Sequence, residues 1–561
     1  MKRWMALAGI ILLGITSVVV SERRKVDVPA SPAALLYLVA DSEQELMRMP
    51  VTFTRMSDQE EIRIGDELAR KYRVSNHQAP EVTTIERYLT QVGSQLASHA
   101  HRKLPYRFHY IPNPYSINAF ALPGGHVYVA QGLLALMDSE DELAAVVGHE
   151  IEHIDHYHCA ERAQQEEALR KIPLGGLVAL PVEIFVAGYS KDQELEADRE
   201  GTRLAVETGY SANGVIRMFE SLARLYREYQ VKAKTPQGEL SEVALETLGG
   251  YFRSHPLPAE RIAQVQQLMA REGWAVRPER DLAVAYIFLS AKAQIAFETH
   301  RYPEAEQLAN RSLRVQPEQP KVLELLARAQ FAQAIFSAAA ATYRKLLEQD
   351  SSNPEMIVAY AQALAASDRR NAVVEFRRWA ESSNGHLPKD AEVAEAGLAL
   401  LSGNPEAARR LEAEFTQGDA DQTPKLAGEL GWWHYLNGDY PKAIDLLSEE
   451  VQQRPRTVTP SLRLAWAKIE VREYRDALEV LTAIRTNRQI PPEGTMARAV
   501  ASWQSQEHEE ALRYFGSAVR AQPEWENSNW VRALYSPRVA ESVVEIETKL
   551  EHERARVAVN R

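Results

Sequence analysis

The sequence predicts a mainly α-helical protein in which an α+β first part is followed by an α-solenoid. Three observations carry this prediction. A capped helical stretch contains His-Glu-Ile-Glu-His at residues 149–153, an alternating segment around Pro123-Gly124-Gly125 predicts a β-hairpin, and a pattern ending in alanine recurs through the second half. With 561 residues the chain is too long for one hydrophobic core, so we expect two or more domains.

The histidine run lies on a predicted helix with a clear start. Ser139, followed three residues later by Glu142, is typical of a capping box, and apolar residues then recur at helical spacing. On such a helix His149 and His153 project from one face and can bind one zinc ion, while Glu150 points toward the remaining coordination position. Because zinc lowers the pKa of water toward ~7, Glu150 is the candidate general base.

A catalytic zinc site needs a third protein ligand. One class of zinc peptidase has a histidine six residues after the second one, but Cys159 stands there and excludes that class. Another class takes a glutamate from a later helix. Downstream, Glu194 and Asp198 share one helical face, so Glu194 is the candidate ligand and Asp198 is the candidate acceptor for the free N–H of a ligand histidine.

The predicted hairpin spans residues 116–129 and offers a candidate surface for substrate. If its edge lies beside the zinc, an extended peptide would bind it as an added strand. The candidate substrate-binding residues are Asn118, Ala119, Phe120 and Ala121. A hairpin with a purely structural role is the alternative.

Four motifs in this order resemble the gluzincin zinc metallopeptidases of the HtpX and BepA type. The motifs are Asn118–Gly125, the His-Glu-x-x-His run, Glu194-x-x-x-Asp198 and the segment His255–Ile262. The resemblance covers about residues 50–275. It implies a metalloendopeptidase with one Zn²⁺ per chain on His149, His153 and Glu194, with Glu150 as general base.

The last motif contains two further candidate residues. His255 precedes a proline, so its segment is a stiff extended loop that would lean over the metal. His255 and Arg261 are both candidates for stabilising the oxyanion. His255 is equally a candidate fourth ligand that closes the resting site, and an ordinary loop histidine is the remaining alternative.

The second half is a predicted repeat array. Its tetrads end at Ala305, Ala339, Ala372, Ala407, Ala443, Ala477 and Ala511, spaced by 34, 33, 35, 36, 34 and 34 residues. This period belongs to tetratricopeptide helix pairs, and the tetrads around Ala372 and Ala407 are the most divergent. Stacked repeats form a curved solenoid with a concave groove, so we expect the array to bind a protein.

The N-terminus predicts export. Two basic residues, Lys2 and Arg3, precede about sixteen apolar residues, which is the length of a signal-peptide core and short for a membrane span. The cleavage site is indistinct, so an N-terminal membrane anchor stays open. Residues 172–188 are also apolar and predict a buried helix or a mobile flap, with membrane contact as the lesser alternative. A net charge of −12 without long runs argues against a nucleic-acid partner.

The predicted order is a signal or anchor at 1–25, a peptidase domain at 50–275, repeats at 285–535 and a capping helix at 537–561. This order resembles proteases of the BepA type. The resemblance implies the periplasm of a Gram-negative bacterium and, as partners, unfolded or stalled outer-membrane β-barrel proteins with their assembly machinery. Two alternatives stay open. One is a chaperone or assembly factor with little proteolysis, and the other is a membrane-anchored protease that acts on membrane proteins.

Overall fold

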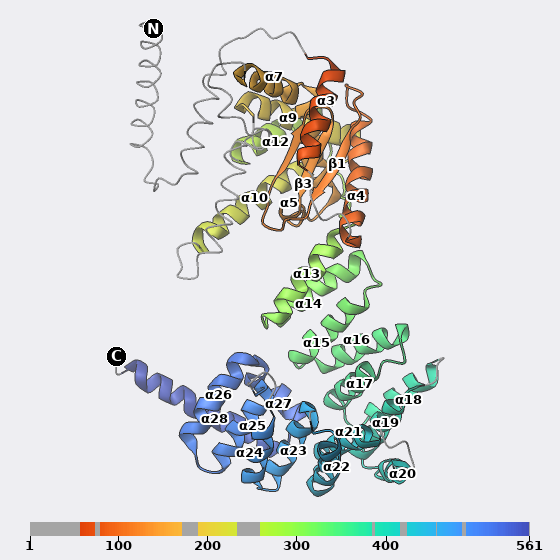
Figure 1. Cartoon of the computed structure of the whole chain (residues 1–561), viewed down its shortest axis with the longest axis vertical. Coiled ribbons are helices and arrows are strands. Elements are labelled where there is room, and N and C mark those ends of the chain that lie inside the picture. Colours follow the sequence, from red (N-terminus) through yellow and green to blue (C-terminus); the bar gives the residue numbers. More distant parts are fainter. Residues whose placement is uncertain are drawn as a thin grey trace. The chain divides into compact units, whose positions relative to one another are not determined.

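The computed structural model describes residues 56–72, 79–170, 189–232, 258–383, 387–415, 423–455, 457–484 and 490–559. The expected signal or anchor, the apolar segment 172–188 and His255 lie outside the described residues. The chain divides between Ala285 and Tyr286 into two compact units (Figure 1). Among the described helices, none has the length and apolar character that crossing a membrane requires.

The first unit combines eight described helices with one small sheet. The helices are α3 (Asp58–Lys71), α4 (Pro80–Ala97), α5 (Gln131–Leu134), α6 (Glu140–Asp155), α7 (His158–Arg170), α9 (Lys191–Glu207), α10 (Asn213–Lys232) and α12 (Pro258–Glu272). The strands are β1 (Arg107–Ile111), β2 (Ala119–Leu122) and β3 (His126–Ala130), in the order β1-β3-β2.

The predicted hairpin is confirmed as the antiparallel pair β2–β3, in which Phe120 pairs with Tyr128. Gly124 and Gly125 make its turn with φ of 75° and 106°, a backbone conformation that favours glycine. The sequence did not predict β1, which pairs with β3 in the parallel direction. Within the described sheet, β2 is therefore an edge strand, and it packs against α6.

The helix α6 begins where the sequence predicts, but the cap differs in one detail. The Ser139 hydroxyl accepts the backbone N–H of Glu142, as in a capping box. The Glu142 carboxylate, however, accepts the N–H of Asp138 at 2.7 Å and pairs with Arg217. In a capping box this carboxylate would accept the N–H of Ser139 instead. The cap still fixes the start of the helix that carries the two histidines.

Two glycines set the crossing of α6 with α9. A Cβ atom added to Gly201 would lie 2.7 Å from the backbone nitrogen of His149, and one added to Gly148 would lie 2.9 Å from the carbonyl oxygen of Gly201. The two backbones therefore touch, which side chains at either position would prevent. This close approach places Glu194, on the later helix, beside the histidines of the earlier one.

The second unit is a succession of helices. They are α13 (Ala285–Glu298), α14 (Tyr302–Val315), α15 (Pro320–Ala332), α16 (Phe336–Gln349), α17 (Pro354–Ser367), α18 (Ala372–Ser382), α19 (Lys389–Leu401), α20 (Glu406–Phe415), α21 (Thr423–Leu436), α22 (Tyr440–Gln453), α23 (Val458–Glu470), α24 (Tyr474–Ala483), α25 (Pro492–Gln504), α26 (His508–Ala521), the 3₁₀ helix η2 (Pro523–Glu526), α27 (Ser528–Leu534) and α28 (Pro537–Val559). Consecutive helices pack as antiparallel pairs, and the solenoid class predicted from the period is confirmed.

The recurring alanines mark the contact between the two helices of a pair. Six of the seven tetrad alanines are buried to 2% exposure or less, which leaves no room for a larger side chain there. Ala407 is the exception, because α20 begins late and the neighbouring Ala408 is buried instead. The helix α18 also begins late, at Ala372 itself. The structure thus confirms that the central tetrads diverge.

Five of the described turns between paired helices share a left-handed residue at the same position. His300, Ala334, Arg472 and Gln506 have φ between 58° and 66°, and Gly438 takes the same position with φ of 83°. These residues stand two positions before the second helix of their pairs. Each residue other than glycine carries a conformational cost there.

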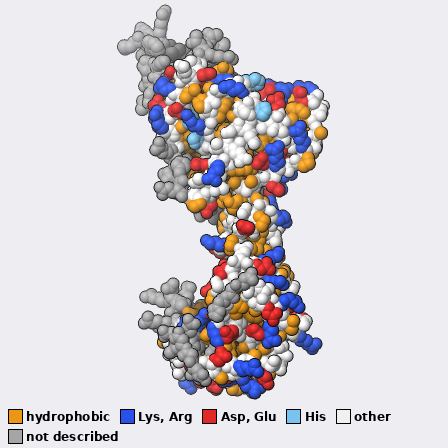
Figure 2. All heavy atoms as spheres, turned by 90° about the vertical axis from the view of Figure 1, so that its right-hand side faces the viewer, with side chains coloured by type: hydrophobic (Ala, Val, Ile, Leu, Met, Phe, Trp, Pro, Cys, Tyr) orange, Lys and Arg blue, Asp and Glu red, His pale blue; other side chains and the backbone are white. Residues whose placement is uncertain are grey.

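Charge is mixed over the surface. On the face drawn in Figure 2, lysine and arginine side chains are interspersed with aspartate and glutamate side chains on both units. This pattern agrees with a net charge of −12 that is spread along the sequence without long runs.

Candidate metal and peptidase site

Three donor side chains converge between α6 and α9. The Nε2 atoms of His149 and His153 lie 3.1 Å apart, and each lies 3.5 Å from a carboxylate oxygen of Glu194. One donor atom from each residue lies within 4.8 Å of the others, and all three side chains are buried. Tetrahedral donors about 2.1 Å from a common ion lie roughly 3.4 Å apart, so this set fits a metal ion such as zinc.

A buried ion pair holds His149 from behind. The Nδ1 atom of His149 lies 2.9 Å from a carboxylate oxygen of Asp198. Arg261 donates two hydrogen bonds to this carboxylate, at 2.6 and 2.5 Å, and its guanidinium lies 4.1 Å from the ring centre of Phe219. Although burial alone would raise the pKa of Asp198, Arg261 and His149 lower it, so the carboxylate stays charged.

His149 lies among negative charges. Burial opposes its positive charge, yet the carboxylates of Asp198 and Glu194 raise the pKa of His149 to about 10. The surroundings therefore stabilise a positive charge at this point, as expected where a cation binds.

Glu150 follows His149 on the same helix, lines the same pocket and is 3% exposed. Burial raises the pKa of Glu150 to about 7, and a hydrogen bond from the backbone of Ala121 partly offsets the shift. A carboxyl group whose pKa lies near neutral pH can both accept and return a proton, which a general base and acid requires.

His153 has a different set of neighbours. The ring of Tyr189 stacks on it with centroids 3.9 Å apart, and the Nδ1 atom of His158 lies 3.0 Å from its own Nδ1 atom. The Tyr189 hydroxyl contacts the sulfur of Cys159 at 3.1 Å. The lone cysteine is fully buried, and burial raises the pKa of its thiol. Cys159 is therefore a packing side chain rather than a nucleophile.

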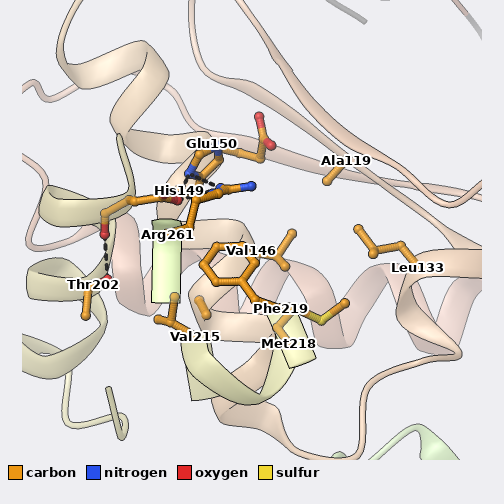
Figure 3. Close-up of a pocket in the computed structure, with 12 residues that line it drawn as sticks. Ala119, Leu133, Val146, His149, Glu150, Thr202, Val215, Met218, Phe219 and Arg261 are labelled. Carbon is orange, nitrogen blue, oxygen red and sulfur yellow. Dashed lines mark hydrogen bonds and ion pairs between the residues drawn. The ribbon is translucent and has the colours of Figure 1, made fainter. Parts of the chain in front are cut away.

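A pocket opens beside His149 and Glu150. Figure 3 shows that Leu133, Val146 and Met218 form its apolar wall. Phe219 and Arg261 border the pocket on the side of Asp198. A lining of this composition favours an apolar side chain.

The candidate edge strand lies beside the site. Ala119 lines the pocket with His149 and Glu150 (Figure 3), whereas Phe120 points to the opposite face and packs against the rings of Tyr72 and Tyr128. The backbone of Ala121 is already used, since its N–H bonds to Glu150 and its carbonyl accepts the thiol of Cys159 at 3.8 Å. Asn118 is half-buried at the start of the strand.

The two other candidates have different outcomes. His255 lies outside the described residues, so its position beside the metal stays a prediction. The guanidinium of Arg261 faces Asp198, with one nitrogen 3.4 Å from Nδ1 of His149. This geometry favours support of the ligand histidine over contact with an oxyanion.

Several residues at the site were not found from the sequence. Tyr189 and Phe219 stack on site residues, and Gly201 sets the helix crossing. Thr202 donates its hydroxyl to the carbonyl of Asp198 at 2.5 Å. The signal available in the sequence was a glycine in the interior of each of two predicted helices, which often marks a close helix contact.

The comparisons with known proteins agree with this geometry. Residues 84–269 match peptidase family M48, and residues 290–354 and 462–524 match a tetratricopeptide repeat family. The β-barrel assembly-enhancing protease of Escherichia coli (strain K12) is 28% identical over 251 residues, which are 40% of this chain and 47% of that protein. The protein of that name in Yersinia pestis is 23% identical over 440 residues, 70% of this chain and 84% of that one.

The chain thus matches less than half the length of the Escherichia coli relative. Among solved structures, a tetratricopeptide repeat protein from Parabacteroides merdae aligns with a TM-score of 0.29 at 14% identity, over 46% of this chain and 98% of that one.

The chain contains a metallopeptidase domain of family M48 followed by tetratricopeptide repeats. Its similarity to β-barrel assembly-enhancing proteases confirms the resemblance to gluzincins of the HtpX and BepA type with C-terminal repeats.

Proposed function

We propose that this protein is a zinc-dependent endopeptidase of the bacterial cell envelope. The observation that carries the proposal is the convergence of His149, His153 and Glu194 within 4.8 Å, with buried Glu150 on the same helix. Two imidazoles and one carboxylate are a ligand set of catalytic zinc sites, which leave one position for water or substrate. Zinc bound there would polarise a peptide carbonyl and acidify water at neutral pH.

The protein side chains divide the remaining work. Glu150, whose pKa of about 7 suits proton exchange, takes a proton from the attacking water and delivers it to the leaving amine. Asp198 holds His149 in one tautomer and orientation through its contact with Nδ1, and Arg261 keeps Asp198 charged. An apolar substrate side chain would enter the pocket beside Val146 and Met218, while Ala119 would lie along the bound peptide.

The proposed substrates are unfolded or stalled outer-membrane β-barrel proteins in the periplasm. The names of the similar proteases and the presence of repeats, which commonly bind other proteins, support this assignment. His255 is proposed to act near the metal, either on the oxyanion or as a ligand that closes the resting site. An N-terminal signal or anchor at 1–25 would deliver the chain to this compartment.

The test uses the full chain loaded with one zinc per molecule and an unfolded outer-membrane β-barrel protein as substrate. We expect cleavage by the unaltered chain and a loss of at least ~10³-fold with Glu150→Gln, because the proton acceptor is removed while the ligands remain. Glu207→Gln, at an exposed position of α9, is the matched control and should retain full activity.

Co-purification separates the proposal from its main rival. The Glu150→Gln variant should retain uncleaved clients, and their identities report the substrate class directly. If the unaltered chain holds zinc, leaves every client intact and prevents aggregation as well as Glu150→Gln does, the protein is a chaperone and the peptidase proposal is wrong.

A further inference from the structure

Residues 523–535 lie within the curve of the repeat array. The hydroxyl of Tyr302, in the first helix pair, donates to the carboxylate of Glu524 at 2.6 Å. The side-chain amide of Asn527 donates to the carbonyl of Gln333 at 3.4 Å. These bonds join positions 222 and 194 residues apart, and Figure 1 shows α27 on the side that faces α17. A segment that touches early and late repeats together lies on their inner side.

Three aromatic side chains anchor this segment. Trp525, Trp530 and Tyr535 are 0%, 6% and 7% exposed. Tyr535 packs with its ring centre 5.0 Å from that of Trp466 in α23 and 6.3 Å from that of Trp432 in α21. The indole of Trp525 lies 5.9 Å from Trp466. The inner surface of α21 and α23 is therefore an aromatic platform, and the chain's own C-terminal segment covers it.

A half-buried carboxylate gives this platform a chemical preference. Glu493 of α25 accepts the indole N–H of Trp466 at 3.0 Å and the hydroxyl of Tyr535 at 3.1 Å. Burial raises the pKa of Glu493, while these two hydrogen bonds oppose the shift. An occupant with a phenylalanine in place of Tyr535 would remove one of the two donors from this half-buried acceptor, which weakens its binding. The site therefore favours a tyrosine or tryptophan side chain.

The segment is a poorly satisfied occupant. It is built from a four-residue 3₁₀ helix and a seven-residue α-helix, whereas α23 and α25 each have 13 residues. Within the described part of the chain, the buried indole N–H groups of Trp525 and Trp530 meet no acceptor. Each buried donor without an acceptor destabilises the docked segment, which favours release of the segment over unfolding of the helices beneath it.

We propose that the surface formed by Trp432, Trp466 and Glu493 is the docking site of the array for protein segments that carry tyrosine or tryptophan, and that residues 523–535 are its resting occupant. A client segment binds by displacing this occupant. The inference goes beyond the proposed peptidase function, because it assigns a ligand chemistry and an internal competitor to the repeats. An occupant attached to the same chain competes at an effective concentration in the millimolar range, so clients bind weakly until it is released.

The experiment measures binding of a fluorescent peptide with the sequence of residues 521–536 to the full chain. Trp530→Ala/Tyr535→Ala weakens the internal occupant, and Arg532→Ala, at an exposed position of the same segment, is the matched control. We expect the double variant to bind the peptide at least ~10-fold more tightly than the unaltered chain and Arg532→Ala. A peptide with phenylalanine at its Tyr535 position should bind the double variant less tightly. Equal affinities for all three proteins, or no binding to a folded double variant, would overturn the proposal.

Hydrogen exchange of the unaltered chain gives a second, independent measurement, which decides the matter if circular dichroism shows that the double variant is unfolded. Amides of residues 524–535 should exchange through a local opening, faster than those of α23 and α25. Exchange of all three only together would mean that the segment is a fixed part of the array and would contradict displacement. Both measurements concern binding by the repeats and not peptide cleavage. They can therefore contradict the docking proposal without contradicting the peptidase proposal, and the cleavage assay can contradict the peptidase proposal without contradicting the docking proposal.

Discussion

The two units bury different kinds of side chains. The first buries a dense set of ionisable groups around the crossing of α6 and α9, namely Asp141, Glu142, His149, Glu150, Glu152, His153, Asp155, His158, Glu194, Asp198 and Arg261. The repeat array buries mainly alanine, leucine and aromatic residues, with Glu450 and Glu470 among its few buried charges. Burying charge is unfavourable unless it is paired, so its concentration in one place marks the part of the molecule where chemistry is expected.

The units also differ in the range of their contacts. Each helix pair of the array packs on its neighbours, so a sequence pattern of about 34 residues determines most of the contacts of the array. The peptidase site depends on single contacts between distant segments, such as Arg261 with Asp198 and Gly201 with His149. One substitution should therefore disable the first unit, whereas the array should tolerate most single changes outside its tight contacts.

Gly201→Ala is expected to disturb both the packing of the first unit and its donor set. The added Cβ would lie 2.7 Å from the nitrogen of His149 and 2.9 Å from the carbonyl carbon of Gly148, so α6 and α9 must separate. Overpacking of this kind costs about 1–3 kcal/mol or more, and the separation would pull Glu194 away from the histidines. We expect zinc binding and peptidase activity to fall at least ~100-fold, as measured by metal analysis and peptide cleavage. Glu207→Ala, at an exposed position of the same helix, should change neither.

The next prediction concerns the ligand set itself. Glu194→Ala removes one of the three donors and should abolish stoichiometric zinc binding while the helical circular dichroism spectrum persists. Glu196→Ala is the matched control, because its side chain is 38% exposed and pairs with His158 outside the donor set. Full zinc occupancy in Glu194→Ala would move the third ligand to His156 or His255.

The sequence predicted those features that local patterns determine. The helix with His149 and His153, the hairpin turn at Gly124 and the period of the repeats all follow from neighbours along the chain. Glu194 lies beside the histidines because Gly148 contacts Gly201 where the two helices cross. A local sequence pattern does not indicate which two glycines form such a contact. The contact of Arg261 with Asp198 was not predicted for the same reason, since the two residues lie 63 positions apart.

The array has its own unpredictable features. Its helices and turns follow from the period, but the return of residues 523–535 to Tyr302 and Gln333 depends on the accumulated curvature of all the pairs between them. The parallel strand β1 is a comparable case in the first unit. It pairs with β3, so that Arg107 lies opposite His126, although β2 stands between these two strands in the sequence. A hairpin pattern does not predict this pairing. Local sequence thus predicts elements, whereas their closure depends on three-dimensional packing.

A charge in the array provides a sharper test of the comparison. Glu450 is 3% exposed and pairs with Arg454 at 2.9 Å, yet burial and the nearby Glu429 raise its pKa to about 7. Because the folded chain holds this proton more tightly than the unfolded chain, with its ordinary pKa near 4.5, the contribution to stability is lost as pH rises from about 4.5 to 7. We expect the unaltered chain to lose roughly 1–3 kcal/mol more than Glu450→Gln between pH 4.5 and 8.

The measurement is urea unfolding of both proteins, followed by circular dichroism at the two pH values. The glutamine keeps an oxygen that can accept a hydrogen bond from Arg454 but has no titrating proton. A difference between the two proteins therefore reports the titration of Glu450 and not the loss of its contact with Arg454. Identical pH dependence in both proteins would mean that Arg454 neutralises Glu450 fully. In that case the array would tolerate buried charge in the same way as the peptidase unit.

The smallest effect tests whether the turns of the array are interchangeable, as a repeat requires. Arg472 is exposed and has φ of 66°, and Gly438 has φ of 83° at the equivalent turn with no atom within 4 Å of an added Cβ. Arg472→Gly removes the left-handed strain and should stabilise the chain by roughly 0.5–1 kcal/mol, after the greater freedom of glycine in the unfolded state is subtracted. Gly438→Ala should destabilise it by a similar amount, so that the double variant returns near the original unfolding midpoint in urea. The sites are far apart in sequence and share no partner, so additivity is expected. A loss of stability in Arg472→Gly would show that this turn is held by a side-chain contact rather than by backbone geometry, and that the repeats differ where the period makes them look alike.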